Sequence, residues 1–166
     1  MTLQITVLGI PVPKGSAKYY PTKRGKVVVT HDNPKTQPWG EMVVASALTE
    51  KMRRQHRQLE GPVGLALRFF LPRPKSAPRR VTEPTKKPDL DKLIRAVKDG
   101  LTRAGIYRDD AQVVVLFARK EFAAGATDPL GADGIPRAWI EVGPQPEVLA
   151  SGHWPGEGLS GKAAPA

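Results

Sequence analysis

Two pairs of aspartates in one short stretch are the residues of this chain best suited to chemistry. Asp89 and Asp91 open the segment KPDLDKLIRAVKDGLTRAGIYRDDAQV, residues 87–113, and Asp109 and Asp110 lie near its end. Carboxylate oxygens are the ligands that magnesium prefers, with water and a substrate phosphate usually completing the shell. A bound cation would also remove the mutual repulsion of such a group. The pattern indicates a site for a hard divalent ion.

The residues between the two pairs have the pattern of an amphipathic helix. The apolar positions with i, i+3, i+4, i+7 spacing are Leu90, Leu93, Ile94, Val97 and Leu101. Asp89 is suited to the N-cap, where its carboxylate would accept backbone N–H groups of the first turn. Gly105 is a natural end. Asp91 and Arg95 fall on one flank of the apolar stripe, so the Asp91 carboxylate is expected to point away from the core.

A metal site requires the two pairs to meet in space. Asp109 or Asp110 begins a predicted strand, and three carboxylates converge if that strand lies beside the helix N-terminus. The ion could then position water, polarise a phosphodiester and stabilise the leaving oxyanion. The alternative is a structural role for each aspartate. Asp89 would only cap the helix, Asp91 would pair with Arg95 one turn on, and the second pair would form a turn.

The composition favours a polyanionic partner. The chain of 166 residues has a formal net charge of +10, and cations that face phosphates gain affinity by releasing counterions. A basic but merely solvated surface is the alternative. The chain has no cysteine, which excludes disulfides and thiolate metal sites. No stretch approaches the ~18 apolar residues of a membrane span, so we expect a cytoplasmic, nucleoid-associated protein without a membrane partner.

The chain reads as one small domain of mixed α/β (α+β) class. We expect one folded domain over residues 1–143 and a disordered tail, rich in Gly, Pro and Ala, over residues 144–166. The domain is predicted to hold one mixed sheet of about five strands packed with two main helices. The expected strands are residues 3–10, 26–30, 63–71, 111–123 and 137–142, and the expected helices are residues 35–55 and the one that begins at Asp89.

Basic residues concentrate in two segments and around the acidic pairs. The first segment, PVPKGSAKYYPTKRGKVVVT, interleaves lysines with tyrosines, and the second, residues 72–88, is a proline-rich basic arm that leads into the acidic stretch. Both suit contact with a nucleic-acid backbone, although a charged hairpin and a solvated linker are the alternatives. The candidate DNA-binding residues are Lys14, Lys18, Arg79, Arg80, Lys86, Lys87, Lys92 and Lys98.

The acidic stretch also resembles a known family. PDLDKLIRAVKDGLTRAGIYRDDAQV strongly resembles the RusA family of Holliday junction resolvases, whose signature is an Asp-x-Asp pair opening a helix, a basic residue one turn later, and Asp-Asp-x-Gln after the helix. The N-terminal PVPKGSAKYY is similar to the proline-rich basic opening of that family. The resemblance covers roughly residues 3–142.

The resemblance implies a small homodimer that nicks two symmetry-related strands of a four-way DNA junction, using magnesium or manganese. Asp89, Asp91 and Asp110 would be the metal-binding carboxylates, with Asp109 a neighbour that assists. Arg95 stands where the family commonly has a catalytic lysine. Because arginine does not readily give up a proton, it suits a phosphate clamp or transition-state cation better than a base. Lys98 on the same flank is a candidate substitute.

The sequence therefore predicts a magnesium-dependent endodeoxyribonuclease that resolves Holliday junctions in DNA recombination and repair. One rival is a nuclease for other branched DNA, such as flaps or forks. Another is a branched-DNA-binding protein with weak or no cleavage. The sequence does not decide between two candidates for the dimer surface, which are the strand at residues 3–10 and the helix at residues 35–55.

Overall fold

A computed structural model describes residues 1–15, 17–21, 27–31, 34–123 and 133–145. The predicted tail lies, apart from its first two residues, outside the described residues. Within the described ranges, no helix is long and apolar enough to cross a membrane.

Four strands form the main sheet in the order β1-β6-β4-β5. They are β1 (Leu3–Leu8), β4 (Val63–Leu71), β5 (Val113–Phe122) and β6 (Arg137–Pro144). Strand β6 runs antiparallel to β1 and β4, whereas β4 and β5 are parallel. The connection between the parallel strands contains a helix, as such crossover connections usually do. The C-terminal ends of β4 and β5 therefore lie at the same end of the sheet.

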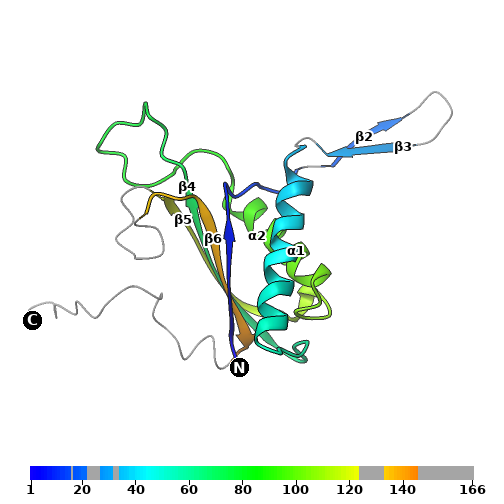
Figure 1. Cartoon of the computed structure of the whole chain (residues 1–166). Helices are drawn as coiled ribbons and strands as arrows, with labels where there is room; N and C mark the ends of the chain where they lie inside the picture. Colours follow the sequence, from blue (N-terminus) through cyan, green and yellow to red (C-terminus); the bar gives the residue numbers. More distant parts are fainter. Residues whose placement is uncertain (16, 22–26, 32–33, 124–132, 146–166) are drawn as a thin grey trace, which may run out of the picture.

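Two helices, α1 (Thr36–Arg53) and α2 (Leu90–Arg103), cover one face of this sheet (Figure 1). The apolar face predicted for α2 is confirmed, since Leu93, Val97 and Leu101 are fully buried in the main core. The short 3-10 helix η1 (Asp110–Gln112) leads directly into β5. The second acidic pair is thus placed at the start of an edge strand.

Helix α2 ends in a hydrogen-bonded turn at Gly105. Gly105 has φ of 63°, and the backbone N–H groups of Gly105 and Ile106 donate to the carbonyls of Thr102 and Leu101, at 2.9 and 3.0 Å. This is the paired hydrogen-bond pattern that ends many helices at a left-handed glycine. The expected end of α2 is confirmed. The chain then turns back beside the helix.

The mixed α+β class is confirmed, but the prediction of one five-stranded sheet was wrong in detail. Strands β2 (Ala17–Pro21) and β3 (Val27–His31) form a separate antiparallel pair, which projects from the body of the molecule (Figure 1). The strand expected at residues 26–30 exists but pairs locally with β2, which was missed. Two antiparallel strands that are close in sequence can form backbone hydrogen bonds with each other without joining a larger sheet.

The contact between the two helices generates a prediction about stability. A Cβ atom at Gly100 would lie 2.5 Å from Val43 Cγ1, whereas one at Gly40 would meet only Arg103 Nη1 at 3.8 Å. We expect Gly100→Ala to lower the free energy of unfolding by about 1–3 kcal/mol, because the packed helices must separate. Gly40→Ala is the matched control and should raise it by up to about 1 kcal/mol through helix propensity. Urea unfolding measures both, and equal effects would contradict the close contact.

Candidate metal and nucleic-acid site

Asp89 occupies the N-cap position of α2, but its side chain makes no capping hydrogen bond. The expectation that its carboxylate caps the helix was therefore wrong. Instead, Asp89 Oδ2 lies 3.4 Å from Lys92 Nζ, and both side chains are close to half exposed. An exposed ion pair of this kind contributes little stability. The Asp89 carboxylate is thus available to a ligand.

Asp91 and Arg95 lie one turn apart on α2 and are both exposed. Among the described residues, neither side chain forms a hydrogen bond or ion pair. The alternative in which Asp91 serves only to pair with Arg95 is not what the structure shows. A free carboxylate and a free guanidinium face solvent beside Asp89.

Asp109 and Gln112 form a capping box around η1. Asp109 Oδ1 accepts from the Ala111 N–H at 2.8 Å, and Gln112 Oε1 accepts from the Asp109 N–H at 3.1 Å. Gln112 Nε2 also donates to the carbonyls of Leu59 and Gly61. The expected turn before the strand is confirmed for Asp109, whose carboxylate is engaged by the backbone. The role of Gln112 was missed, although the Asp-x-x-Gln spacing carries the signal of a capping box.

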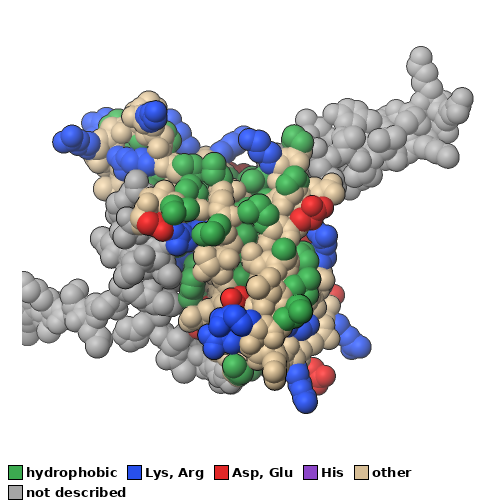
Figure 2. Space-filling view, viewed as in Figure 1, with side chains coloured by type: hydrophobic (Ala, Val, Ile, Leu, Met, Phe, Trp, Pro, Cys, Tyr) green, Lys and Arg blue, Asp and Glu red, His purple; other side chains and the backbone are tan. Residues whose placement is uncertain are grey.

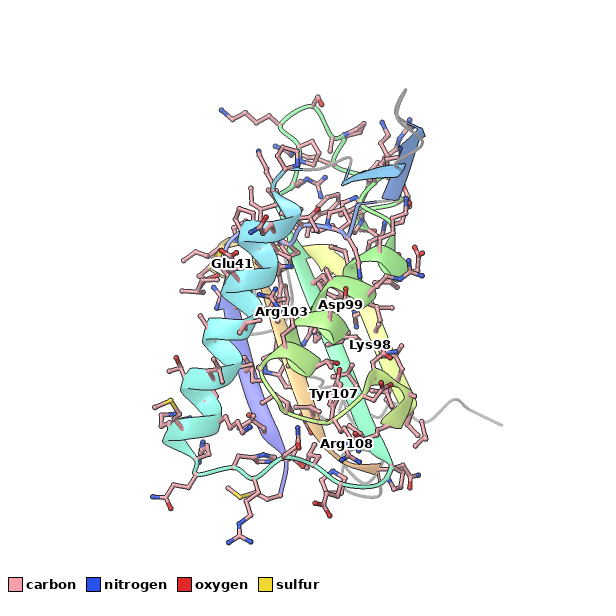
Figure 3. All side chains as sticks on the ribbon, turned by 90° about the vertical axis from the view of Figure 1, so that its right-hand side faces the viewer. Glu41, Lys98, Asp99, Arg103, Tyr107 and Arg108 are labelled. Atoms are coloured by element: carbon pink, nitrogen blue, oxygen red, sulfur yellow. The ribbon has the colours of Figure 1, made fainter. Side chains whose placement is uncertain are left out.

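Asp110 is paired with a cation from the middle of α2. Its Oδ2 lies 3.1 Å from Lys98 Nζ, and the Tyr107 hydroxyl donates to the Lys98 carbonyl at 3.2 Å (Figure 3). Burial raises the pKa of the Tyr107 phenol above its usual range, with Asp110 among the nearby charges that add to the effect. Tyr107 therefore stays protonated and supports the chain beside α2.

The two acidic pairs do not meet within one chain. The described residues contain no group of three or more His, Cys, Asp or Glu side chains that could hold a metal ion. Asp110 lies beside Lys98, which follows Asp91 by about 10 Å along the helix axis. The expectation that three carboxylates converge in a single chain was therefore wrong. Asp89 and Asp91 alone suit magnesium, which often uses one or two carboxylates with water and phosphate.

Lys120 lies at this site and was not among the residues predicted from the sequence. Its ammonium group donates to the carbonyls of Lys86 and Pro88, at 2.9 Å each. These contacts attach the backbone just before Asp89 to the far end of β5. They join residues more than thirty positions apart, and no local sequence pattern predicts such contacts.

Three of the candidate DNA-binding lysines form ion pairs with aspartates, and one of them is the Lys92–Asp89 pair described above. Lys14 forms an ion pair with Asp99, and its backbone N–H donates to the Lys92 carbonyl at 3.0 Å. Lys98 pairs with Asp110. Lys18 lies on β2 opposite Thr30, and its side chain is outside the described residues.

The remaining four candidates belong to the 72–88 segment, which has no helix or strand, as predicted. Lys and Arg side chains gather on this projecting segment (Figure 2), and Arg79, Arg80, Lys86 and Lys87 are all exposed. The segment is held by backbone turns and by a 2.9 Å hydrogen bond from Arg73 Nη2 to the Pro78 carbonyl. Lys86 and Lys87 directly precede the start of α2, whereas Arg79 and Arg80 lie further back on the segment.

An acidic pair at a helix start, cations on an adjoining loop and a mixed sheet define a candidate nucleic-acid-processing site. Comparison with protein families gives a match to endodeoxyribonuclease RusA over residues 9–140. The chain belongs to this family. It is also 32% identical over 131 residues to the uncharacterized protein YqaN of Bacillus subtilis strain 168, covering 73% of this chain and 88% of that protein.

The capping box predicts a clear difference between two substitutions of one residue. Asp109→Ala removes the acceptor of the Ala111 N–H and should lower the free energy of unfolding by about 1 kcal/mol, whereas asparagine caps as well as aspartate and should change it little. Chemical denaturation of the two variants tests this. An Asp109→Asn variant as unstable as Asp109→Ala would show that the charge, and not the cap, matters at this position.

Proposed function

We propose that this chain is a metal-dependent, structure-selective endodeoxyribonuclease that resolves Holliday junctions by paired nicks in DNA recombination and repair. The observation that supports this most strongly is the pair at the start of α2, where Asp91 is exposed and the partly exposed Asp89 makes no capping hydrogen bond. The pair occurs in a member of the RusA endodeoxyribonuclease family. Asp89 makes only a partly exposed ion pair and Asp91 has no partner among the described residues, so both carboxylates are available for a ligand.

Asp89 and Asp91 would hold the ion, magnesium or manganese. When bound, such an ion activates water and stabilises the oxygen that leaves the cleaved phosphodiester. Arg95, one turn further along the exposed flank of α2, is placed to clamp a phosphate and to stabilise charge that develops on it. Lys120 holds the backbone before Asp89 in place through its two carbonyl contacts, so we assign it a positioning role.

DNA binding would come mainly from the 72–88 segment. Arg79, Arg80, Lys86 and Lys87 are exposed there and precede the acidic pair along the chain. Lys92 and Lys98 are each paired with an aspartate of the proposed site. When a metal ion binds the aspartates, both lysines would be free to form ion pairs with DNA phosphates instead.

A homodimer formed through the edge of β5 would complete the site. Strand β5 is an edge strand of the main sheet as the structure describes it, and Val114 and Leu116 are 59% and 41% exposed. An edge with unpaired backbone groups and apolar side chains is a template for another strand. This edge is a better candidate than either surface expected from the sequence, because it adjoins the second acidic pair.

Two-fold pairing of β5 with its copy would bring the two acidic pairs together. In an antiparallel pair, the start of one strand lies beside the end of the other. The end of β5 is attached by Lys120 to the residues before Asp89, and its start follows Asp110. Asp110 of the partner subunit would thus approach Asp89 and Asp91. A symmetric dimer would then carry two equivalent sites, which suits a junction with two strands to cut.

A branched-DNA-binding protein without cleavage is the second candidate. The observation in its favour is Arg95, since the family resemblance places a lysine at this position. Retention of the acidic residues favours the enzyme.

The acidic pair yields a prediction about cleavage. Asp89→Asn and Asp91→Asn should each lower the rate of junction nicking by roughly 100-fold or more, because a metal ligand is lost. Junction affinity should persist or rise, because repulsion between carboxylate and phosphate is reduced. Nicking assays and gel-shift titrations with magnesium measure the two effects. Glu41→Gln, with the same charge change on exposed α1, should behave as wild type.

Equal loss of nicking in the Glu41→Gln control would show that charge alone causes the defect. Cutting of linear duplex at the rate of junctions would rule out the resolvase assignment. A wild-type protein that binds junctions but leaves them intact with both magnesium and manganese would favour the second candidate.

Arg95 can be tested by two substitutions. Arg95→Ala should lower the cleavage rate by about 100-fold, as expected for loss of one group that stabilises the transition state, with a much smaller change in junction affinity. Arg95→Lys should retain cleavage, because the cation is kept. Single-turnover cleavage measures both, and a wild-type rate for Arg95→Ala would remove this residue from the mechanism.

The dimer interface can be tested at an exposed strand position. Val114→Lys should shift the protein from dimer to monomer in analytical ultracentrifugation, because a charge at the paired edge opposes strand addition. Met52→Lys places the same charge on α1, where Met52 is 76% exposed, and should leave the dimer intact. Dissociation by Met52→Lys alone would instead place the interface on α1.

A further inference from the structure

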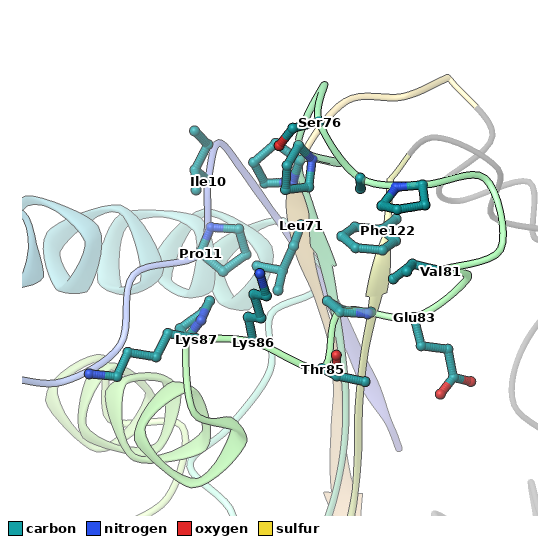
Figure 4. Close-up of a pocket in the computed structure, with 16 residues that line it drawn as sticks. Ile10, Pro11, Leu71, Ser76, Val81, Glu83, Thr85, Lys86, Lys87 and Phe122 are labelled. Atoms are coloured by element: carbon teal, nitrogen blue, oxygen red, sulfur yellow. The ribbon is translucent and has the colours of Figure 1, made fainter.

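A cavity of about 300 Å³ lies beneath the 72–88 segment (Figure 4). Leu71 and Phe122, from the ends of β4 and β5, form part of its wall, and Pro88 lines it as well. The residue after Pro88 is Asp89, the first member of the proposed metal pair. The cavity therefore adjoins the site where the phosphodiester would be cut.

The lining of this cavity is mostly apolar and stiff. Eleven of its sixteen lining residues are proline, alanine, valine, leucine, isoleucine or phenylalanine, and proline fixes the backbone φ. The Arg73 guanidinium lies 5.2 Å from the centroid of the Phe122 ring, which holds that ring from one side. Backbone turns from Pro74 to Ala77 and from Pro78 to Val81 further restrain the roof. Most of the cavity wall is therefore formed by stiff residues, and its long flexible side chains are limited to Glu83, Lys86 and Lys87.

The surroundings of the cavity are strongly cationic. The 72–88 segment has six cations and one carboxylate, Glu83. Lys86 and Lys87 belong to the lining and are exposed. A suitable ligand combines an apolar body with negative charges beside it. An apolar protein side chain supplies the first property but not the second.

We propose that this cavity holds one unstacked nucleobase from the branch point of the DNA, next to the phosphate that is cut. This inference rests on the proposed function. A base has flat apolar faces, and the phosphates on either side of it supply the anions that Lys86 and Lys87 would contact. The volume is at the low end of the roughly 300–1,000 Å³ of small-molecule sites. The hydroxyls of Ser76 and Thr85, which also line the cavity, can bond to the edge of the base.

A base pocket beside the metal pair would also give a physical source of junction selectivity. Extracting a base costs least where pairing and stacking are already interrupted, as they are at a branch point. In a continuous duplex the base would stay stacked, and its phosphate would remain displaced from Asp89 and Asp91. Linear DNA could then bind to the cations without being cut.

The test compares intact junctions with junctions that lack one base. An abasic residue is placed in turn at each of the two nucleotides that flank the cut, and affinity is measured in EDTA to prevent metal-dependent cleavage. For one of these positions, the wild-type protein should bind the abasic junction about 5- to 150-fold more weakly, the range for loss of one base–aromatic stack. Equal affinity for the intact junction and both abasic junctions would overturn the proposal.

Variants that fill the cavity connect this effect to the pocket. Ala77→Leu and Ser76→Leu add bulk at the lining and should bind intact and abasic junctions equally, at the weaker level. Thr82→Leu adds the same side chain on the same segment outside the lining and should keep the wild-type difference. Thermal unfolding checks that each variant is folded. Filled variants that keep the difference would overturn the pocket assignment, whereas absence of all junction binding would instead refute the proposed function.

Discussion

The length of α2 is the constraint on which the rest of the site depends. The helix spans 14 residues, with Asp89 and Asp91 at its start, and the chain returns beside its second half before Asp110. At about 1.5 Å per residue, this separation is too large for one ion to be shared within a chain. This is why we propose that a second copy of the protein completes the site.

Hydrogen bonds at opposite ends of β5 hold the two acidic pairs in place, which supports a dimer in which the pairs of two copies meet. At the start of the strand, Gln112 attaches η1 to the carbonyls of Leu59 and Gly61. At the end, Lys120 attaches the backbone before Asp89 to the sheet. The edge between these hydrogen bonds presents Val114 and Leu116 to solvent. One strand thus positions both acidic pairs, and pairing with its own copy would place unlike ends together.

The sequence predicted those features that depend on local patterns. The apolar spacing of α2, its end at Gly105 and the irregular 72–88 segment could all be read from residue type and order. The features that it missed are one side-chain conformation and several contacts between distant residues. Asp89 has the type and position of a cap, yet its carboxylate faces Lys92 on the first turn of the same helix and not the backbone N–H groups. The Lys120 contacts have no local signal. The ends of α2 could be read from the sequence, but the place where the chain returns beside the helix could not, and that place keeps Asp110 away from Asp91.

The most direct measurement of the central claim mixes two inactive variants. Asp91→Asn and Asp110→Asn proteins are each assayed alone and then after subunit exchange, with a junction and magnesium. If each site takes Asp91 from one subunit and Asp110 from its partner, the mixed dimer has one intact site and should nick one strand of the junction. If both residues serve the site of their own chain, every mixed dimer has two defective sites, and the absence of nicking after exchange would contradict the account.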